Sequence, residues 1–66
     1  MRIRINGQWH DRSDGIRVAG LLRELELEPR RVAVELNKKI VRRADFDKTS
    51  LAEEDSLEIV TLVGGG

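Results

Sequence analysis

The first eleven residues, Met1-Arg2-Ile3-Arg4-Ile5-Asn6-Gly7-Gln8-Trp9-His10-Asp11, decide how this chain begins to fold. Apolar residues alternate with two arginines over the first five positions, which is the period of two of a half-buried strand. Asn6-Gly7 then favours a two-residue type I′ turn, because both residues tolerate positive φ. We therefore predict a β-hairpin at the start of the chain.

After the hairpin, the apolar residues change to helical spacing. Val18, Leu21, Leu22 and Leu25 fall at i, i+3, i+4 and i+7, so they share one helix face. We expect Pro29 to end this helix, because proline disfavours helical geometry at the residue before it. One amphipathic helix is therefore predicted between residues 18 and 28.

The second half of the chain returns to alternation. Strands are predicted at residues 32–36, around Ile40-Val41 and at residues 57–62, with a turn at Asn37. A helix that crosses over between strands makes the first and last strands parallel neighbours in the sheet centre. The predicted class is therefore α+β: a mixed four- to five-stranded sheet packed on one main helix.

Length, charge and composition exclude several classes of function. Sixty-six residues allow one small domain. Twelve basic and twelve acidic side chains give no net charge, which argues against nucleic acid or a membrane surface as partner. The chain has no cysteine and a single histidine, His10, which we expect to face solvent. We therefore expect no metal site, no bound cofactor and no secretory signal, and a cytoplasmic protein.

The chain ends with Val63 followed by three glycines, Gly64, Gly65 and Gly66. We predict a folded domain over residues 1–63 and a flexible tail over residues 64–66. A segment without β-carbons can enter a narrow channel and carry its terminal carboxylate into the active site of another protein. The alternative is a frayed end or a truncated flexible linker.

The last strand also predicts a surface for a partner. If Leu57 and Ile59 point inward, Val60 and Leu62 point outward. Surplus apolar surface on a solvated face often marks a binding site, although single exposed apolar residues are common. The predicted partner-binding face consists of Ala33, Val60, Leu62 and Val63.

Over its whole length the chain resembles the ThiS family, the ubiquitin-like sulfur carriers of thiamine biosynthesis. The segments that carry this resemblance are Ile5-Asn6-Gly7, Val32-Ala33-Val34-Glu35-Leu36-Asn37, Ile40-Val41 with Arg43, Asp55-Ser56-Leu57-Glu58-Ile59-Val60 and Val63-Gly64-Gly65-Gly66. Lys38-Lys39, Arg42 and Arg17 depart from the family pattern.

The resemblance implies a β-grasp fold and a carrier that is not itself an enzyme. A ThiF-type adenylating enzyme would activate the carboxylate of Gly66 with ATP and magnesium. Sulfur from a cysteine-derived persulfide would then replace the adenylate and leave a thiocarboxylate on Gly66. A ThiG-type thiazole synthase would use this sulfur to build the thiazole ring.

Three alternatives stay open at this point. Related β-grasp carriers serve molybdopterin synthesis, tRNA thiolation or cysteine synthesis and share the diglycine end. The segment of Asn37 and Ile40-Val41 favours the thiamine branch over these. A ubiquitin-type protein modifier and an adaptor that does not react are the remaining alternatives.

Overall fold

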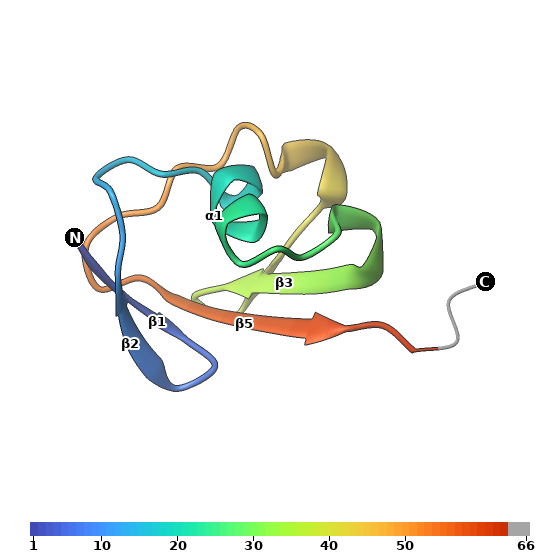
Figure 1. Ribbon diagram of the computed structural model, residues 1–66, viewed down its shortest axis with the longest axis horizontal. Coiled ribbons are helices and arrows are strands. Elements are labelled where there is room, and N and C mark those ends of the chain that lie inside the picture. The colour runs from blue at the N-terminus through green and yellow to red at the C-terminus, as the bar shows by residue number, and fades with distance from the viewer. Residues whose placement is uncertain (64–66) are drawn as a thin grey trace.

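The computed structural model describes residues 1–63, and the predicted tail, residues 64–66, lies outside the described residues. Figure 1 shows one helix lying across one face of a twisted sheet. The elements in chain order are β1 (Arg2–Ile5), β2 (Gln8–Asp11), α1 (Val18–Glu24), the 3₁₀ helix η1 (Pro29–Arg31), β3 (Val32–Leu36), β4 (Lys39–Val41), the 3₁₀ helix η2 (Arg43–Asp45) and β5 (Ser56–Thr61).

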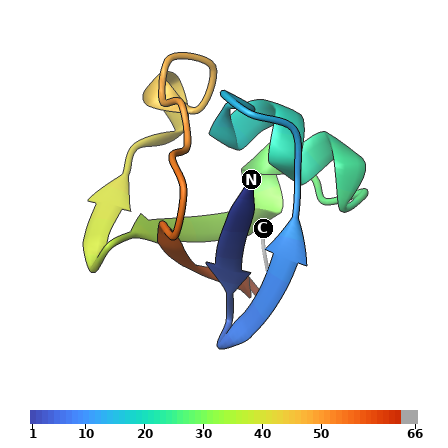
Figure 2. The same ribbon diagram turned by 90° about the vertical axis from the view of Figure 1, so that its left-hand side faces the viewer.

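The strands form a single five-stranded sheet in the order β2-β1-β5-β3-β4. β1 and β5 run parallel, and the other neighbouring pairs are antiparallel. Figure 2 shows the sheet from its end, with the helix on one side and nothing of the described chain covering the other. The predicted mixed sheet is confirmed, and so is the parallel pairing of the first and last strands.

Both hairpins turn on residues with positive φ. Asn6 and Gly7 have φ of 50° and 84°, which confirms the predicted type I′ turn between β1 and β2. Asn37 and Lys38 have φ of 51° and 71° and join β3 to β4 in the same way. The side-chain amide of Asn37 donates to Asp55 Oδ1 at 3.0 Å, which ties this second turn to the start of β5.

The helix ends earlier than the sequence predicted. α1 stops at Glu24, Glu26 adopts a left-handed φ of 58°, and the N–H of Leu27 donates to the carbonyl of Leu22 at 2.9 Å. This is a Schellman motif, which closes the helix by its own hydrogen bonds. Pro29 begins η1 instead, so the prediction that it terminates the helix was wrong.

The first turn of α1 is capped by the backbone of a distant loop. Arg17, at the N-cap, makes no side-chain capping bond. The N–H groups of Val18 and Ala19 instead donate to the carbonyls of Thr49 and Phe46, both at 2.9 Å. Free helical donors must find such partners, and here the loop after η2 supplies them.

The core lies between α1 and the inner face of the sheet. Its buried residues are Ile3, Ile5, Val18, Leu21, Leu22, Val32, Val34, Phe46, Leu51, Leu57 and Ile59. The register pairs Ile3 with His10, so both side chains share this inner face, and His10 is half-buried. The expectation that His10 faces solvent was therefore wrong.

Candidate functional site: the outer sheet face at the end of β5

β5 is held firmly as it approaches the C-terminus. The side chain of Asn6 donates to the carbonyl of Ile59 at 3.0 Å and accepts from its N–H at 2.8 Å. This amide continues the pairing beyond the end of β1. On the other side, the N–H of Leu62 donates to the carbonyl of Arg31 at 2.6 Å. The glycines therefore follow a strand whose position is fixed from both sides.

Three of the predicted partner-binding residues, Ala33, Val60 and Leu62, lie on the outer face of the sheet, and Val63 follows Leu62 beyond the end of β5. Val60 is 55% exposed, Leu62 is 48% exposed and Val63 is 95% exposed. Ala33 of β3 is directly opposite Val60 in the antiparallel register and is half-buried. The outward orientation expected of Val60 and Leu62 is confirmed. Their role in binding stays a prediction.

Ile40 extends this apolar surface to the edge of the sheet, although it is not among the predicted partner-binding residues. Ile40 lies opposite Glu35, and its side chain is 76% exposed. The signal was present in the alternation of β4, because the inward-facing Val41 requires its neighbour Ile40 to point outward. We use the name apolar face for Ala33, Ile40, Val60, Leu62 and Val63.

The hairpin end of the outer sheet surface has a different character. Trp9 is exposed on β2, and the guanidinium carbons of Arg2 and Arg4 lie 4.1 and 5.6 Å from its ring centroid. These are cation–π contacts, which hold the two arginines over the ring. The outer surface therefore carries two arginines, Trp9 and Asp11 over β1 and β2, and apolar residues with carboxylates over β5, β3 and β4.

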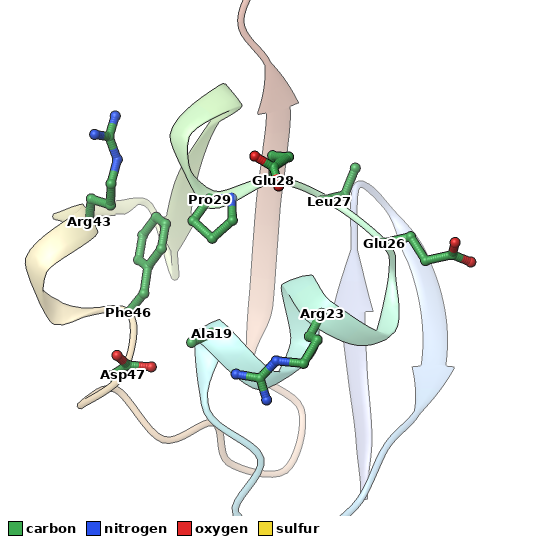
Figure 3. Close-up of a pocket in the computed structure, with 9 residues that line it drawn as sticks. All are labelled: Ala19, Arg23, Glu26, Leu27, Glu28, Pro29, Arg43, Phe46 and Asp47. Atoms are coloured by element: carbon green, nitrogen blue, oxygen red, sulfur yellow. The ribbon is translucent and has the colours of Figure 1, made fainter.

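A hollow lies on the opposite side of the molecule, against the helix. Figure 3 shows its apolar wall, with Ala19, Pro29 and Phe46, and the guanidinium groups of Arg23 and Arg43 beside it. Its volume is about 610 Å³, and three carboxylates, those of Glu26, Glu28 and Asp47, also line it. Arg43, one of the residues that carry the family resemblance, lies here and not on the apolar face.

Residues 1–63 contain no group of three His, Cys, Asp or Glu side chains that could hold a metal ion. None of the helices described within that range is long and apolar enough to cross a membrane.

Comparison with known proteins decides the family. The model of the ThiS family matches residues 3–66. The chain belongs to the ThiS family. The sulfur carrier protein ThiS of Bacillus subtilis is 34% identical over 67 residues, covering 97% of this chain and 98% of that protein. The chain therefore groups with the sulfur carrier family of thiamine biosynthesis.

A solved structure shows the same fold. The crystal structure of the thiamine biosynthesis protein ThiS from Geobacter metallireducens superimposes with a TM-score of 0.87 and 30% identity, and each chain covers 100% of the other. The β-grasp fold that the resemblance implied is confirmed.

The family segment also occurs within larger proteins. A thiazole synthase from Magnetococcus marinus is 41% identical over 66 residues. This chain spans only 20% of the length of that synthase.

Proposed function

We propose that this protein carries sulfur as a thiocarboxylate on its C-terminal Gly66 and donates it for formation of the thiazole ring of thiamine. In this proposal, a ThiF-type enzyme first joins the carboxylate of Gly66 to the AMP portion of ATP with magnesium, releasing pyrophosphate. The terminal sulfur of a persulfide derived from cysteine then attacks the adenylate and displaces AMP, which gives an acyl disulfide on Gly66. A thiol next attacks the sulfur of this disulfide that is not bonded to the carbonyl, so that the thiol is oxidised to a new disulfide and Gly66 is released as the thiocarboxylate. A ThiG-type thiazole synthase accepts that sulfur in the cytoplasm.

The observation that carries the proposal is the position of the three glycines. They follow β5, the central strand, which Asn6 and β3 hold in place as far as Leu62. A short tail on a fixed strand allows a partner that grips the folded domain to find the terminal carboxylate at a defined distance. Gly64 and Gly65 add no side chains that would obstruct a narrow channel.

The apolar face supports a protein partner at this end of the molecule. Complete burial of an exposed aliphatic side chain is worth roughly 1.5–3 kcal/mol. Val60, Leu62 and Ile40 are each about half-exposed or more, so a partner that covers them gains part of this free energy from each. We propose that Val60, Leu62, Val63 and Ala33 contact the adenylating enzyme and the synthase in turn.

The thiazole synthase as acceptor has separate support. In Magnetococcus marinus, a segment similar to this whole chain occurs within a protein named thiazole synthase. The same arrangement occurs in Paramagnetospirillum magneticum, with 39% identity over 66 residues. A carrier segment within the same polypeptide as its acceptor favours the thiamine branch over the sibling pathways of sulfur transfer.

The deciding experiment measures intact mass. The full chain is incubated with the adenylating enzyme of its own organism, ATP, magnesium, an enzymatic persulfide source and a thiol reductant. We expect it to gain the mass difference between sulfur and oxygen, with the change confined to the C-terminal peptide. A chain lacking Gly66 serves as the control and should stay unmodified. The enzyme is first shown to be active on a carrier that it is already known to modify. If the mass of this chain then stays unchanged, the proposal is overturned.

A second measurement separates the carrier from the remaining alternatives. The thiocarboxylate form is mixed with the thiazole synthase and, in parallel, with a molybdopterin synthase subunit. Loss of sulfur to the thiazole synthase alone supports the thiamine role. Covalent adducts with lysines of other proteins would instead indicate a modifier of the ubiquitin type.

Substitution in the tail tests whether threading matters. Gly65→Ala adds one methyl group beyond the folded strand, so we expect a slower adenylation with the melting temperature unchanged. Pyrophosphate release and thermal unfolding measure the two quantities. An equal loss of stability and activity would show that Gly65 supports the folded domain instead.

A further inference from the structure

Two glutamates on the outer surface of the sheet face one another in an unfavourable arrangement. Glu35 of β3 lies directly opposite Glu58 of β5 in the antiparallel register. The β-carbons of such a pair are about 4.5–5.5 Å apart, and like charges at this spacing destabilise a sheet. Ile40 is the neighbour of Glu35 on the other side, so an apolar residue and two carboxylates form one row across three strands.

Neither glutamate belongs to an ion pair within residues 1–63. The ion pairs found in this range are Met1–Asp14 and Arg12–Glu24. Arg4 and Lys38 line the same hollow as the two glutamates without forming an ion pair with either. The repulsion between the two carboxylates therefore destabilises the free protein, and no ion pair within residues 1–63 offsets it.

The two carboxylates lie beside three residues of the apolar face. Ala33, Ile40 and Val60 line a shallow depression of about 170 Å³ together with Glu35 and Glu58. A partner that covers the apolar residues must also remove water from both carboxylates. Removing water from charges is unfavourable unless the partner supplies opposite charges with good hydrogen-bond geometry.

We infer that the adenylating enzyme docks on the apolar face with an arginine whose guanidinium bridges Glu35 and Glu58, while an apolar side chain covers Ile40 and Val60. A guanidinium fits because it is planar and has five donors, enough to bond two carboxylates at once, whereas an ammonium is a compact point charge. This inference rests on the proposed function, since it names the partner that the carrier must meet first.

The chemistry of the adenylation site also favours this partner. An enzyme that binds ATP gathers cationic groups around the triphosphate. The strand that bears Glu58 and Val60 leads directly to the carboxylate that must reach that site. Acidic groups beside the tail therefore attract the carrier towards a basic region, and they select against a partner that presents carboxylates there.

The test compares the double variant Glu35→Gln/Glu58→Gln with the wild-type carrier. Pyrophosphate release is measured against carrier concentration with the adenylating enzyme. We expect KM for the carrier to rise about tenfold, which corresponds to about 1.4 kcal/mol, with kcat unchanged. The melting temperature of the free variant should be equal or higher, because the repulsion between the carboxylates is removed.

The matched control is Glu26→Gln/Glu28→Gln, which removes the same charge from the helix side of the molecule. Its KM should equal that of the wild type. Binding of each carrier to the enzyme is also measured by calorimetry without ATP, at low and high salt. The wild type should lose affinity with salt more steeply than the Glu35→Gln/Glu58→Gln variant, because its contact is ionic.

Three results would overturn the inference: an unchanged KM in the Glu35→Gln/Glu58→Gln variant, an equal rise in the control, or an effect confined to the thiazole synthase. The calorimetric measurement tests the docking contact independently of sulfur transfer, so the docking inference and the proposed function can fail separately. Binding that depends on Glu35 and Glu58, in a carrier that never acquires sulfur, would support the docking contact and overturn the sulfur role.

Discussion

The two faces of the sheet carry similar apolar residues, but those on the inner face are buried in the core and those on the outer face are exposed. On the inner face, Leu57 and Ile59 of β5 are buried under α1. On the outer face, Val60 and Leu62 of the same strand and its extension stay about half-exposed. Apolar surface stabilises the fold only where the chain itself covers it. The exposed outer residues therefore contribute little to folding, and their burial by a partner would contribute to the free energy of binding.

The largest effect on stability should come from the inner face. Leu57 is fully buried at the sheet centre, so Leu57→Ala removes packed methyl groups and leaves a cavity. We expect a loss of about 2–5 kcal/mol in the free energy of unfolding, measured by chemical denaturation. Val60→Ala, on the outer face of the same strand, should lose less than about 0.5 kcal/mol. Equal losses would contradict the division between the faces.

Asn6 should produce the next largest effect, because it holds β5 at the level where β1 ends. Asn6→Ala breaks both hydrogen bonds to Ile59 and strains a residue with φ of 50°. We expect a loss of about 1–3 kcal/mol, since the partly buried backbone groups lose their partners. Asn6→Gly also removes the two hydrogen bonds, but glycine adopts the positive φ without strain. Comparison of Asn6→Ala with Asn6→Gly therefore separates the contribution of the hydrogen bonds from that of backbone strain. Full stability in Asn6→Gly would mean that the amide bonds are unimportant.

Leu62 should affect binding more than folding. Leu62→Glu places a charge on the apolar face, and the exposed position should change stability by less than about 0.5 kcal/mol. Affinity for the adenylating enzyme, measured by calorimetry, should fall at least about tenfold. The neighbouring exposed Thr61 points to the opposite face, so Thr61→Glu is a control that should bind normally. Unfolding of Leu62→Glu would show that this residue belongs to the core.

The smallest effect is expected at Gly20 of α1. A β-carbon there would lie 3.3 Å from Cγ1 of Ile16, which must then move by a few tenths of an ångström. Alanine favours helix by up to about 1 kcal/mol over glycine. We expect these effects to offset each other, so that Gly20→Ala changes the free energy of unfolding by less than about 0.5 kcal/mol. A large destabilisation would show that Ile16 cannot move.

The strands and turns were predictable because their signals are local. Asn6-Gly7 defines a turn by its own backbone preferences, and alternation in residues 32–36 and 57–62 reports which side chains are buried. The outer position of Val60 and Leu62 follows from that alternation alone. The candidate face was therefore largely available from the sequence.

The features that were missed depend on backbone geometry and on the exact register of the strands. The Schellman motif places a glutamate, Glu26, in a conformation that usually selects glycine. His10 lies on the inner face because the hairpin register pairs it with Ile3. The opposition of Glu35 and Glu58 requires the exact partner of each strand, which no single stretch of sequence reveals.

The capping of α1 by carbonyls of Thr49 and Phe46 has a consequence for how the protein forms during synthesis. A seven-residue helix is far too short to persist alone in water, and its N-terminal donors are met only by a loop made some thirty residues later. The sheet likewise needs β5, the last strand, at its centre. The nascent chain should therefore stay unstructured until β5 has left the ribosome, so that the core and the outer face of the sheet form in a single event.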